Sequence, residues 1–350
     1  MKGLSCSIIL VAACGVLAQS VPQSLPDLPP PTTVLQDKKQ FNALAFGPGS
    51  TFSVQQTPPD FELDSFSVSP DGKWAFMGWA SGRLEVRDLE TGSRIAQFRP
   101  IRGPVYEADY IERTKQLLVT GPHGVIRFVD PHSGKMQREI QTEIGKYKYD
   151  LQKVLVAQDA SWLAYVNQEN GKILDLTSDP PKVLADLGDA YDLALTQDKS
   201  EIWTINREKL IGLKASSWKV IASAPLLDRV QPTGTPTLAI ASSSDGAVAF
   251  VPSQSGILWY ALNTMKGRKL TQNPAFWTAA DRSGNEVLVN ELHALSLYTP
   301  EGALHCQWKQ HPSRGLTISG NGEWLGSLDF GKVELWSLKS LRAVCADRRP

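Results

Sequence analysis

The sequence predicts an all-β fold, a single seven-bladed β-propeller of four-stranded antiparallel blades. The first observation is the stretch Phe66–Phe98, in which short apolar runs alternate with turn sequences and so predict consecutive strands. The second is that weaker copies of this stretch follow about every forty residues. The third is that apolar residues in the copies alternate or run continuously, as in strands covered by neighbouring sheets. Such units stack around a common axis because one blade cannot bury both of its faces alone.

The copies justify the seven blades in order. We expect them to span Leu63–Phe98, Val105–Ile140, Tyr149–Leu187, Tyr191–Leu226, Thr237–Leu270, Phe276–Trp308 and Leu316–Val344. The first turn of most copies carries Asp, Asn or Gly, which tolerate the left-handed backbone of a hairpin tip. Six or eight blades stay open as alternatives, because Phe41–Gln55 either forms a hairpin or supplies a strand that closes the ring. Five tryptophans are expected in the core between blades: Trp74, Trp162, Trp203, Trp259 and Trp336.

The segment before the repeats predicts export. Residues 1–18 have the pattern of a signal peptide, with Lys2, an apolar run over Leu4–Leu17 and small residues before the cleavage point. An uncleaved anchor is the weaker reading, since a membrane-spanning helix needs about 20 apolar residues. The residues around Cys14 resemble a bacterial lipobox, so lipidation of Cys14 is the alternative to simple secretion. Residues 19–40 are expected to form a Pro-rich disordered linker, 41–346 the propeller and 347–350 a tail.

Composition and motifs exclude several classes of function. Lys plus Arg and Asp plus Glu both number 36, so the net charge is zero and no basic stripe predicts a nucleic-acid partner. The sequence has no GxSxG motif, no phosphate-binding glycine loop and no histidine spacing typical of a metal site. We therefore expect no cofactor.

Cys306 and Cys345 are expected on outermost strands of neighbouring blades. Because such strands diverge beyond the reach of a disulfide, the unpaired state is favoured over a disulfide.

The repeats resemble a known group of propellers. The phrases Ser69-Pro70-Asp71-Gly72-Lys73-Trp74 and Leu84-Glu85-Val86-Arg87-Asp88 are similar to those of WD-repeat propellers, and also of TolB-type repeats. The likeness covers roughly 63–344 and implies the fold rather than an activity. No repeat ends in Trp-Asp; Arg87-Asp88, Val129-Asp130 and Trp336-Ser337 stand in that place. Packing between blades is therefore expected to carry more of the stability than a WD-type hydrogen-bond network.

Candidate binding residues lie on one end of the predicted ring. There the turns between second and third strands meet the connections into the next blade, around the central channel. Arg and aromatic residues exposed on such a rim are typical anchors of protein interfaces, and the candidates here are Trp79, Arg102, Tyr147, Tyr149, Tyr191, Arg207, Trp277, Arg314 and Phe330. The alternative for the tyrosines is that they cap the core beneath them. Asn167, Asn206 and Asn290 recur at the ends of second strands, where Asx-turns are the favoured interpretation over an amide ring around a ligand.

Acidic residues near the start of the innermost strands offer a second hypothesis. Asp64, Glu107, Asp150 and Asp192 recur in four consecutive blades. Converging carboxylates bind Ca²⁺, and lactonase-like propellers place a metal at this kind of location, but solvated charges are the favoured interpretation. The sequence therefore predicts an exported, non-enzymatic binding or scaffolding module with a protein partner, in the periplasm or outside the cell and without a transmembrane span. A Ca-type hydrolase that uses the four carboxylates is the alternative.

Overall fold

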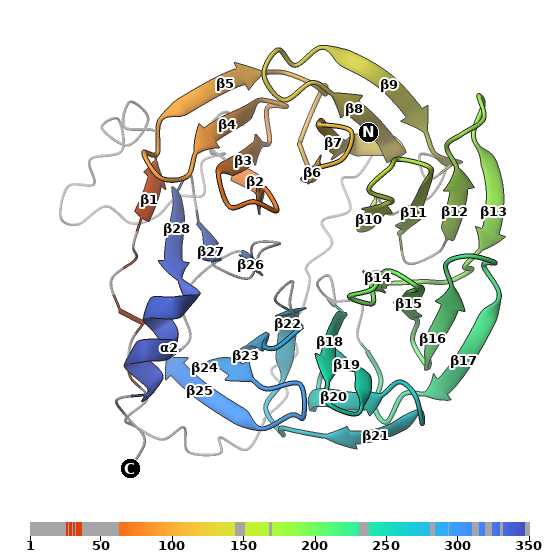
Figure 1. Cartoon of the computed structure of the whole chain (residues 1–350), viewed down its shortest axis with the longest axis vertical. Coiled ribbons are helices and arrows are strands. Elements are labelled where there is room, and N and C mark those ends of the chain that lie inside the picture. The colour runs from red at the N-terminus through yellow and green to blue at the C-terminus, as the bar shows by residue number, and fades with distance from the viewer. Residues whose placement is uncertain are drawn as a thin grey trace, which may run out of the picture.

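The computed structural model describes residues 26, 28, 29, 31, 33–36, 63–143, 151–167, 170–230, 238–280, 284–292, 294–309, 315–318, 324–329 and 332–346. Within these residues the strands form seven four-stranded sheets, in which all neighbouring strands are antiparallel. Figure 1 shows the sheets arranged radially around a common centre. The prediction of an all-β propeller with seven four-stranded blades is confirmed.

Six blades follow the chain in order from the innermost to the outermost strand. Blades one to three are β2 (Leu63–Val68), β3 (Trp74–Trp79), β4 (Leu84–Asp88), β5 (Arg94–Phe98); β6 (Glu107–Ile111), β7 (Gln116–Gly121), β8 (Val125–Val129), β9 (Met136–Gln141); and β10 (Lys153–Val156), β11 (Trp162–Val166), β12 (Gly171–Asp175), β13 (Lys182–Asp186). Blades four to six are β14 (Asp192–Leu195), β15 (Glu201–Ile205), β16 (Lys209–Lys214), β17 (Val220–Pro225); β18 (Ala239–Ser243), β19 (Gly246–Ser253), β20 (Gly256–Ala261), β21 (Lys266–Lys269); and β22 (Ala275–Ala280), β23 (Val287–Glu291), β24 (Ala294–Tyr298), β25 (Leu304–Lys309).

Blade seven combines the two ends of the chain. Its strands β26 (Gly315–Ile318), β27 (Trp324–Asp329) and β28 (Lys332–Ser337) are followed outward by β1 (Thr33–Gln36), which pairs antiparallel with β28. The assignment of 19–40 to a disordered linker is therefore corrected for β1, and Phe41–Gln55, the segment proposed for ring closure, lies outside the described residues. The physical reason is that β28 has a second edge, and β1, in which Thr33 and Val34 are β-branched and favour extended backbone, pairs with that edge.

The residues before β1 also contact the ring. The carbonyl of Pro26 accepts a hydrogen bond from the Lys309 amide at 2.8 Å, and that of Pro29 accepts one from Trp336 Nε1 at 2.8 Å. Leu28 packs against the core between blades six and seven. Proline lacks an amide donor but keeps its carbonyl acceptor, so a Pro-rich extended segment can still bind a neighbouring sheet in this way. We call residues 26–36 the N-terminal strap.

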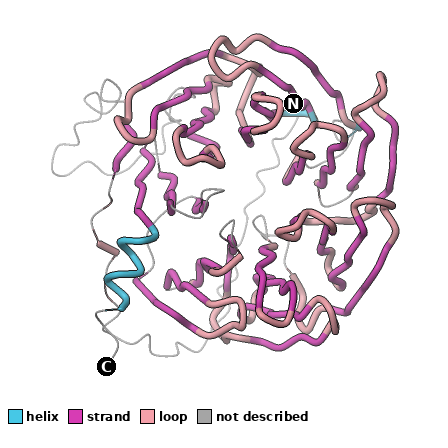
Figure 2. The backbone as a smooth tube through the Cα atoms, in the orientation of Figure 1, coloured by secondary structure: helices cyan, strands magenta, loops and turns pink. Residues whose placement is uncertain are grey.

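The chain after β28 is a helix rather than the expected fourth strand. Helix α2 (Leu338–Ala346) lies at the rim of the ring, as Figure 2 shows, and buries Leu338 and Leu341 in the core of blades six and seven. These leucines are three residues apart, a spacing that is typical of one face of a helix, so the expectation of a strand in this segment is wrong.

The helix also changes the placement of the cysteines. Cys345 lies on α2 and not on an outermost strand. Cys306 on β25 is disulfide-bonded, so the expectation of an unpaired Cys306 is wrong. The Cys345 side chain is outside the described part.

Seven apolar clusters hold the described blades together, one at each boundary between neighbours. The cluster that joins the first blade to the last contains Leu63 and Trp79 from blade one with Val333 and Leu335 from blade seven. Each blade therefore buries both faces, as the repeat pattern predicts. Among the predicted core tryptophans, Trp203 and Trp336 are almost fully buried, whereas Trp74, Trp162 and Trp259 are partly buried. No helix in the described parts of the chain is long and apolar enough to span a membrane.

Candidate functional site: the channel face

We use the term channel face for the end of the ring where the innermost strands begin. The turns between second and third strands and the connections into the next blade lie at the same end. Four innermost residues of consecutive blades occupy one register position, because each pairs with the fifth residue of its second strand: Ser65 with Gly78, Glu107 with Thr120, Lys153 with Val166 and Asp192 with Ile205. Equivalent backbone positions thus place charged side chains from blades two, three and four next to one another.

Glu107 joins blade two to blade three. Its Oε1 accepts a hydrogen bond from Lys153 Nζ at 2.7 Å, and its Oε2 accepts one from the Val154 amide at 3.2 Å. The Glu107 and Lys153 side chains keep 19% and 33% of their exposure, so solvent still screens the ion pair in part. Glu107 therefore serves as a contact between blades, with both carboxylate oxygens engaged.

Asp192 makes the corresponding contact from blade four to blade five. Its Oδ1 accepts a hydrogen bond from its neighbour's amide, Leu193, at 2.7 Å, and its Oδ2 accepts one from the Leu238 amide ahead of β18. The residue is 2% exposed. A buried carboxylate is tolerated where backbone donors satisfy its oxygens, which is the arrangement here.

Burial and the opposing charges of the cluster together set the pKa values of Glu107, Asp192 and Lys153. Burial raises the pKa of Glu107 to about 7 against the opposing charge of Lys153, and the Asp109 carboxylate adds to the increase. Burial also raises the pKa of Asp192 to about 7, while Lys153 and the two amide donors oppose it. Burial alone would lower the pKa of Lys153, but the carboxylates of Glu107, Asp109 and Asp192 outweigh it and raise that pKa. Lys153 therefore remains a cation, whereas Glu107 and Asp192 titrate near neutral pH.

The four carboxylates of the metal hypothesis are not all found together. Glu107 and Asp192 line this cluster, but Asp64 lies at a β-bulge in β2 and Asp150 is outside the described residues. Among the residues that the structure describes, no group of three or more His, Cys, Asp or Glu side chains is arranged to hold a metal ion. Lys153 occupies the equivalent position of blade three, where it forms an ion pair with Glu107 and acts on Asp192 through its charge.

Two of the predicted rim anchors are buried. Trp79 is fully buried in the apolar cluster that joins blade one to blade seven, and the Arg83 guanidinium lies over its ring at 4.1 Å from the centroid. Tyr191 is 3% exposed, and its hydroxyl accepts a hydrogen bond from Arg207 Nε at 2.6 Å. The expectation that Trp79 and Tyr191 offer free surface to a partner is thus corrected, and Tyr191 caps the core as the alternative interpretation had it.

The remaining predicted anchors divide between exposed and undescribed residues. Arg102 and Arg207 are exposed at the channel face. Trp277 lies in β22, but its side chain is not described, and four other candidates lie wholly outside the described residues: Tyr147, Tyr149, Arg314 and Phe330. The Asx-turn interpretation is confirmed for two asparagines, since Asn167 Oδ1 accepts from the Asn170 amide and Asn206 Oδ1 from the Glu208 and Lys209 amides.

Sequence reasoning missed three residues at this face. Lys153 was overlooked because the search followed acidic residues, whereas aligning each innermost strand on its second strand would have placed it beside Glu107. Leu227, in the connection to blade five, and Phe276, near the start of β22, are 57% and 47% exposed. Exposed apolar side chains of this size beside exposed arginines are typical of an interface.

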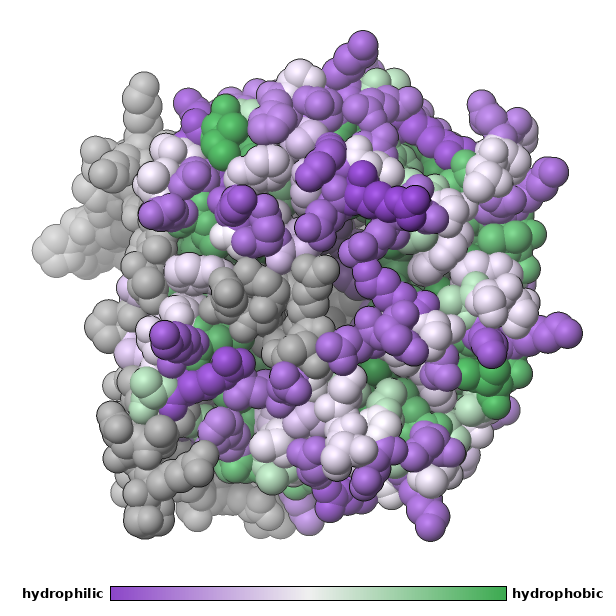
Figure 3. Space-filling model, in the orientation of Figure 1, coloured by the Kyte–Doolittle hydropathy of each residue, from purple (hydrophilic) through white to green (hydrophobic). Residues whose placement is uncertain are grey.

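A second apolar surface lies at the rim of the ring. Outermost strands β13 and β17 expose Val183, Leu184, Val220 and Ile221, and Figure 3 shows apolar side chains at the right-hand rim over these strands. A groove of about 510 Å³ lies between blades four and five, with Ile221 at its edge and Trp203 in its lining. These residues lie on blade edges and belong to no polar constellation, so the channel face is the stronger site candidate.

The comparisons with known proteins show the fold alone. No family model and no curated protein matches the sequence. Among solved structures, the chain is similar to the β-propeller domain of Cps50 (Swd1) from Myceliophteria thermophila, with a TM-score of 0.62 and 14% sequence identity. The likeness covers 81% of this chain and 99% of that one. At this identity the similarity shows the β-propeller fold, and the fold is what the chain shares with that domain.

Proposed function

We propose that the protein is a non-enzymatic binding or scaffolding module that presents its channel face to a protein partner. The observation that carries the proposal is a contrast at this face. The carboxylates of Glu107 and Asp192 are engaged in contacts between blades, whereas Arg102, Arg207, Leu227 and Phe276 are exposed. Arginine and large apolar side chains on a rigid scaffold are suited to anchoring a protein.

The channel carboxylates do not favour the hydrolase alternative. A Ca²⁺ site needs about 6–8 convergent oxygen ligands. Here Glu107 Oε1 is bound by the Lys153 ammonium, so a cation at that oxygen would have to displace an existing one. The alternative predicts a rise in melting temperature with millimolar calcium, because a ligand that binds only the folded state stabilises it. The proposal predicts no such rise.

Export is part of the proposal. The pattern of residues 1–18 and Cys14 suggests secretion or lipidation, and the disulfide at Cys306 supports an oxidising compartment, where disulfides persist. Sequencing of the mature N-terminus by mass spectrometry tests this. We expect a start near Gln19 or a lipidated Cys14, and an intact N-terminal Met would contradict a cleaved export signal.

Site-specific photo-crosslinking tests the binding face. A photoreactive residue is placed at Arg207, Leu227 or Phe276 on the channel face, and at Met136 or Leu304 on outermost strands as controls, since these two are 53% and 52% exposed. We expect one discrete adduct from the channel-face positions after irradiation of cells that express the full chain. Adducts only from Met136 and Leu304, or equal labelling of all positions, would overturn the assignment of the face.

A further inference from the structure

Outermost strand β17 differs in charge from the outermost strands of the other blades that follow the chain order. Those strands, β5, β9, β13, β21 and β25, each contain at least one Lys or Arg. β17 (Val220–Pro225) contains no charged residue. Charged side chains on an outermost strand oppose its pairing with another chain. β17 therefore lacks the protection that the other five edges carry.

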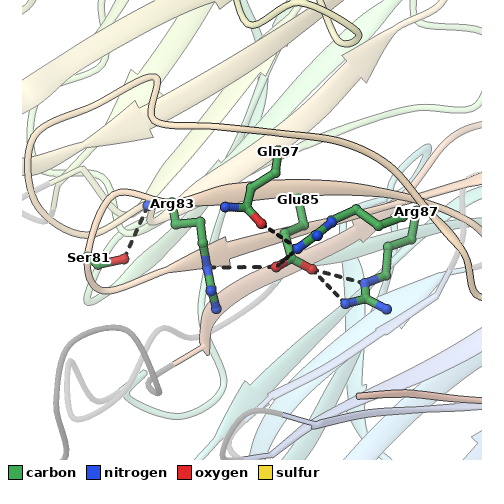
Figure 4. A network of polar contacts seen from close by, with 6 residues as sticks. Ser81, Arg83, Glu85, Arg87 and Gln97 are labelled. Carbon is green, nitrogen blue, oxygen red and sulfur yellow. Dashed lines mark hydrogen bonds and ion pairs between the residues drawn. The ribbon is translucent and has the colours of Figure 1, made fainter. Parts of the chain in front are cut away.

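Blade one illustrates a protected edge. Nη1 of Arg94, on outermost strand β5, lies 3.8 Å from Glu85 Oε1 and donates to Gln97 Oε1 at 2.5 Å. Figure 4 shows the polar network around Glu85, which Arg87 and Gln97 flank. A strand from another molecule that approached β5 would have to pack against these charged and polar groups. The edge of β17 presents no such network of its own side chains.

The outer edge of β17 combines exposed apolar side chains with outward-directed backbone groups. Val220 and Ile221 are 63% and 45% exposed. Among the described residues, β17 pairs only with β16. The Leu226 amide donates to the Glu208 carbonyl on the β16 side, and alternate residues of an antiparallel strand direct their backbone groups to opposite edges. Ser223 therefore directs its N–H and C=O away from β16, where a further strand can pair.

The groove of about 510 Å³ beside β17 provides room for the side chains of such a strand. Ile221 and Ala222 line it from blade four, and Met265 lines it from blade five. Met265 has a φ of +55° in a turn between third and fourth strands, where the corresponding residue of blade one is Gly92. A large side chain in the left-handed region strains the backbone, and such strain is concentrated at functional surfaces. Met265 therefore supports the groove as a binding surface.

A second copy of this chain fits this edge. Because β17 has no charged residue, it can lie antiparallel to its own copy without placing like charges opposite one another. The whole chain carries no net charge, so two copies do not repel each other through their overall charge. Antiparallel pairing of a strand with its own copy is generated by a twofold axis, the commonest symmetry of homodimers.

We propose that two copies of the protein form a dimer through antiparallel pairing of β17 with β17, which covers Val220 and Ile221 of each copy. Innermost strands begin at the channel face and successive strands of a blade alternate in direction, so β17 runs toward the channel face. Antiparallel pairing therefore points the two channel faces in opposite directions. Both faces stay accessible, and the dimer does not depend on the proposed function.

Sedimentation velocity of the purified protein over a range of concentrations tests the dimer. The variant is Ile221→Lys, and the matched control is Ile95→Lys, because Ile95 is 41% exposed and occupies the equivalent bulge of β5. We expect the wild type and the control to form the same dimer, and Ile221→Lys to raise its dissociation constant at least tenfold, since lysines of the two copies would repel. A wild type that stays monomeric, equal dimerisation of all three proteins, or equal losses in both variants would overturn the proposal.

Photo-crosslinking identifies the edge that pairs. A photoreactive residue replaces Ser223, or Gln97 as the control, since the two hold the same register position in β17 and β5. We expect a covalent dimer from Ser223 alone, with the crosslink mapped to β17 of the second copy. A covalent dimer from Gln97 instead would overturn the proposal. Adducts of Ser223 only with other proteins would also overturn it, and would assign the edge to an extended segment of a partner.

Discussion

Replacement of Trp336 by alanine probes the packing that closes the ring. Trp336 is 2% exposed and lies among Leu325 of its own blade, Trp308 of blade six and Leu341 of α2. Its Nε1 also donates to the Pro29 carbonyl of the N-terminal strap. The substitution therefore removes a buried ring from the boundary of two blades and a hydrogen bond that holds the strap.

The expected loss follows from these contacts. A buried Trp→Ala change costs about 3–5 kcal/mol, and the lost hydrogen bond contributes about 1 kcal/mol of such a value. For a folded domain of about 300 residues, an unfolding entropy of about 0.6 kcal/mol/K converts a loss of 4 kcal/mol into a fall of roughly 6 °C in melting temperature. Differential scanning calorimetry measures this fall. Trp336→Phe keeps a ring and loses the hydrogen bond, so we expect a smaller decrease. An unchanged melting temperature for Trp336→Ala would refute the placement of this residue in the core.

Three other perturbations address the channel and the disulfide. Because the folded protein holds protons on Asp192 and Glu107 up to about pH 7, whereas the unfolded chain releases them near pH 4, stability should fall as pH rises from about 4 to 7, by about 4 kcal/mol for Asp192 alone. Asp192→Asn should therefore flatten the plot of melting temperature against pH, and a melting temperature that rises over this range would contradict the reasoning. Lys153→Met leaves Glu107 without its cation and should cost about 2 kcal/mol in urea unfolding, less than for a fully buried pair because both groups meet solvent, and Glu107→Gln/Lys153→Met should recover part of that loss. Since α2 packs beside β25, we expect Cys345→Ser to free the Cys306 thiol for alkylation, and a thiol that stays protected would identify a different partner.

The repeat pattern predicts the position of each blade, but it does not predict which strand closes the ring. Turn residues such as Asp71-Gly72 and the apolar third strands set the position of each four-stranded unit, because hairpin tips and covered strands each demand particular residues. Blade seven departs from the pattern, since its outermost strand comes from Thr33–Gln36, and a contact across 300 residues leaves no local signal. The prolines before β1 also concealed the strap, as their composition is that of a linker while their carbonyls serve as acceptors.

The channel site was predicted in part. Glu107 and Asp192 were found from their recurrence near the start of innermost strands, and they lie in one cluster. Their role differs from metal binding, because Lys153 and backbone amides satisfy them. Trp79 illustrates the limit on the rim, since whether a ring at the end of a strand packs into the core between two blades depends on side-chain geometry that the sequence does not give.

Engineered crosslinking of β1 to β28 tests most directly whether the two ends of the chain close the ring. Val34 and Glu334 face each other in the antiparallel pair, where Cα atoms lie about 4.5–5.5 Å apart and within reach of a disulfide. We expect Val34→Cys/Glu334→Cys to form that disulfide on oxidation, identified by peptide mapping, whereas Val34→Cys/Lys214→Cys, with its second cysteine on blade four, should not. Absence of the Val34–Glu334 crosslink, or equal crosslinking in the control, would contradict closure of the propeller by its N-terminal strap.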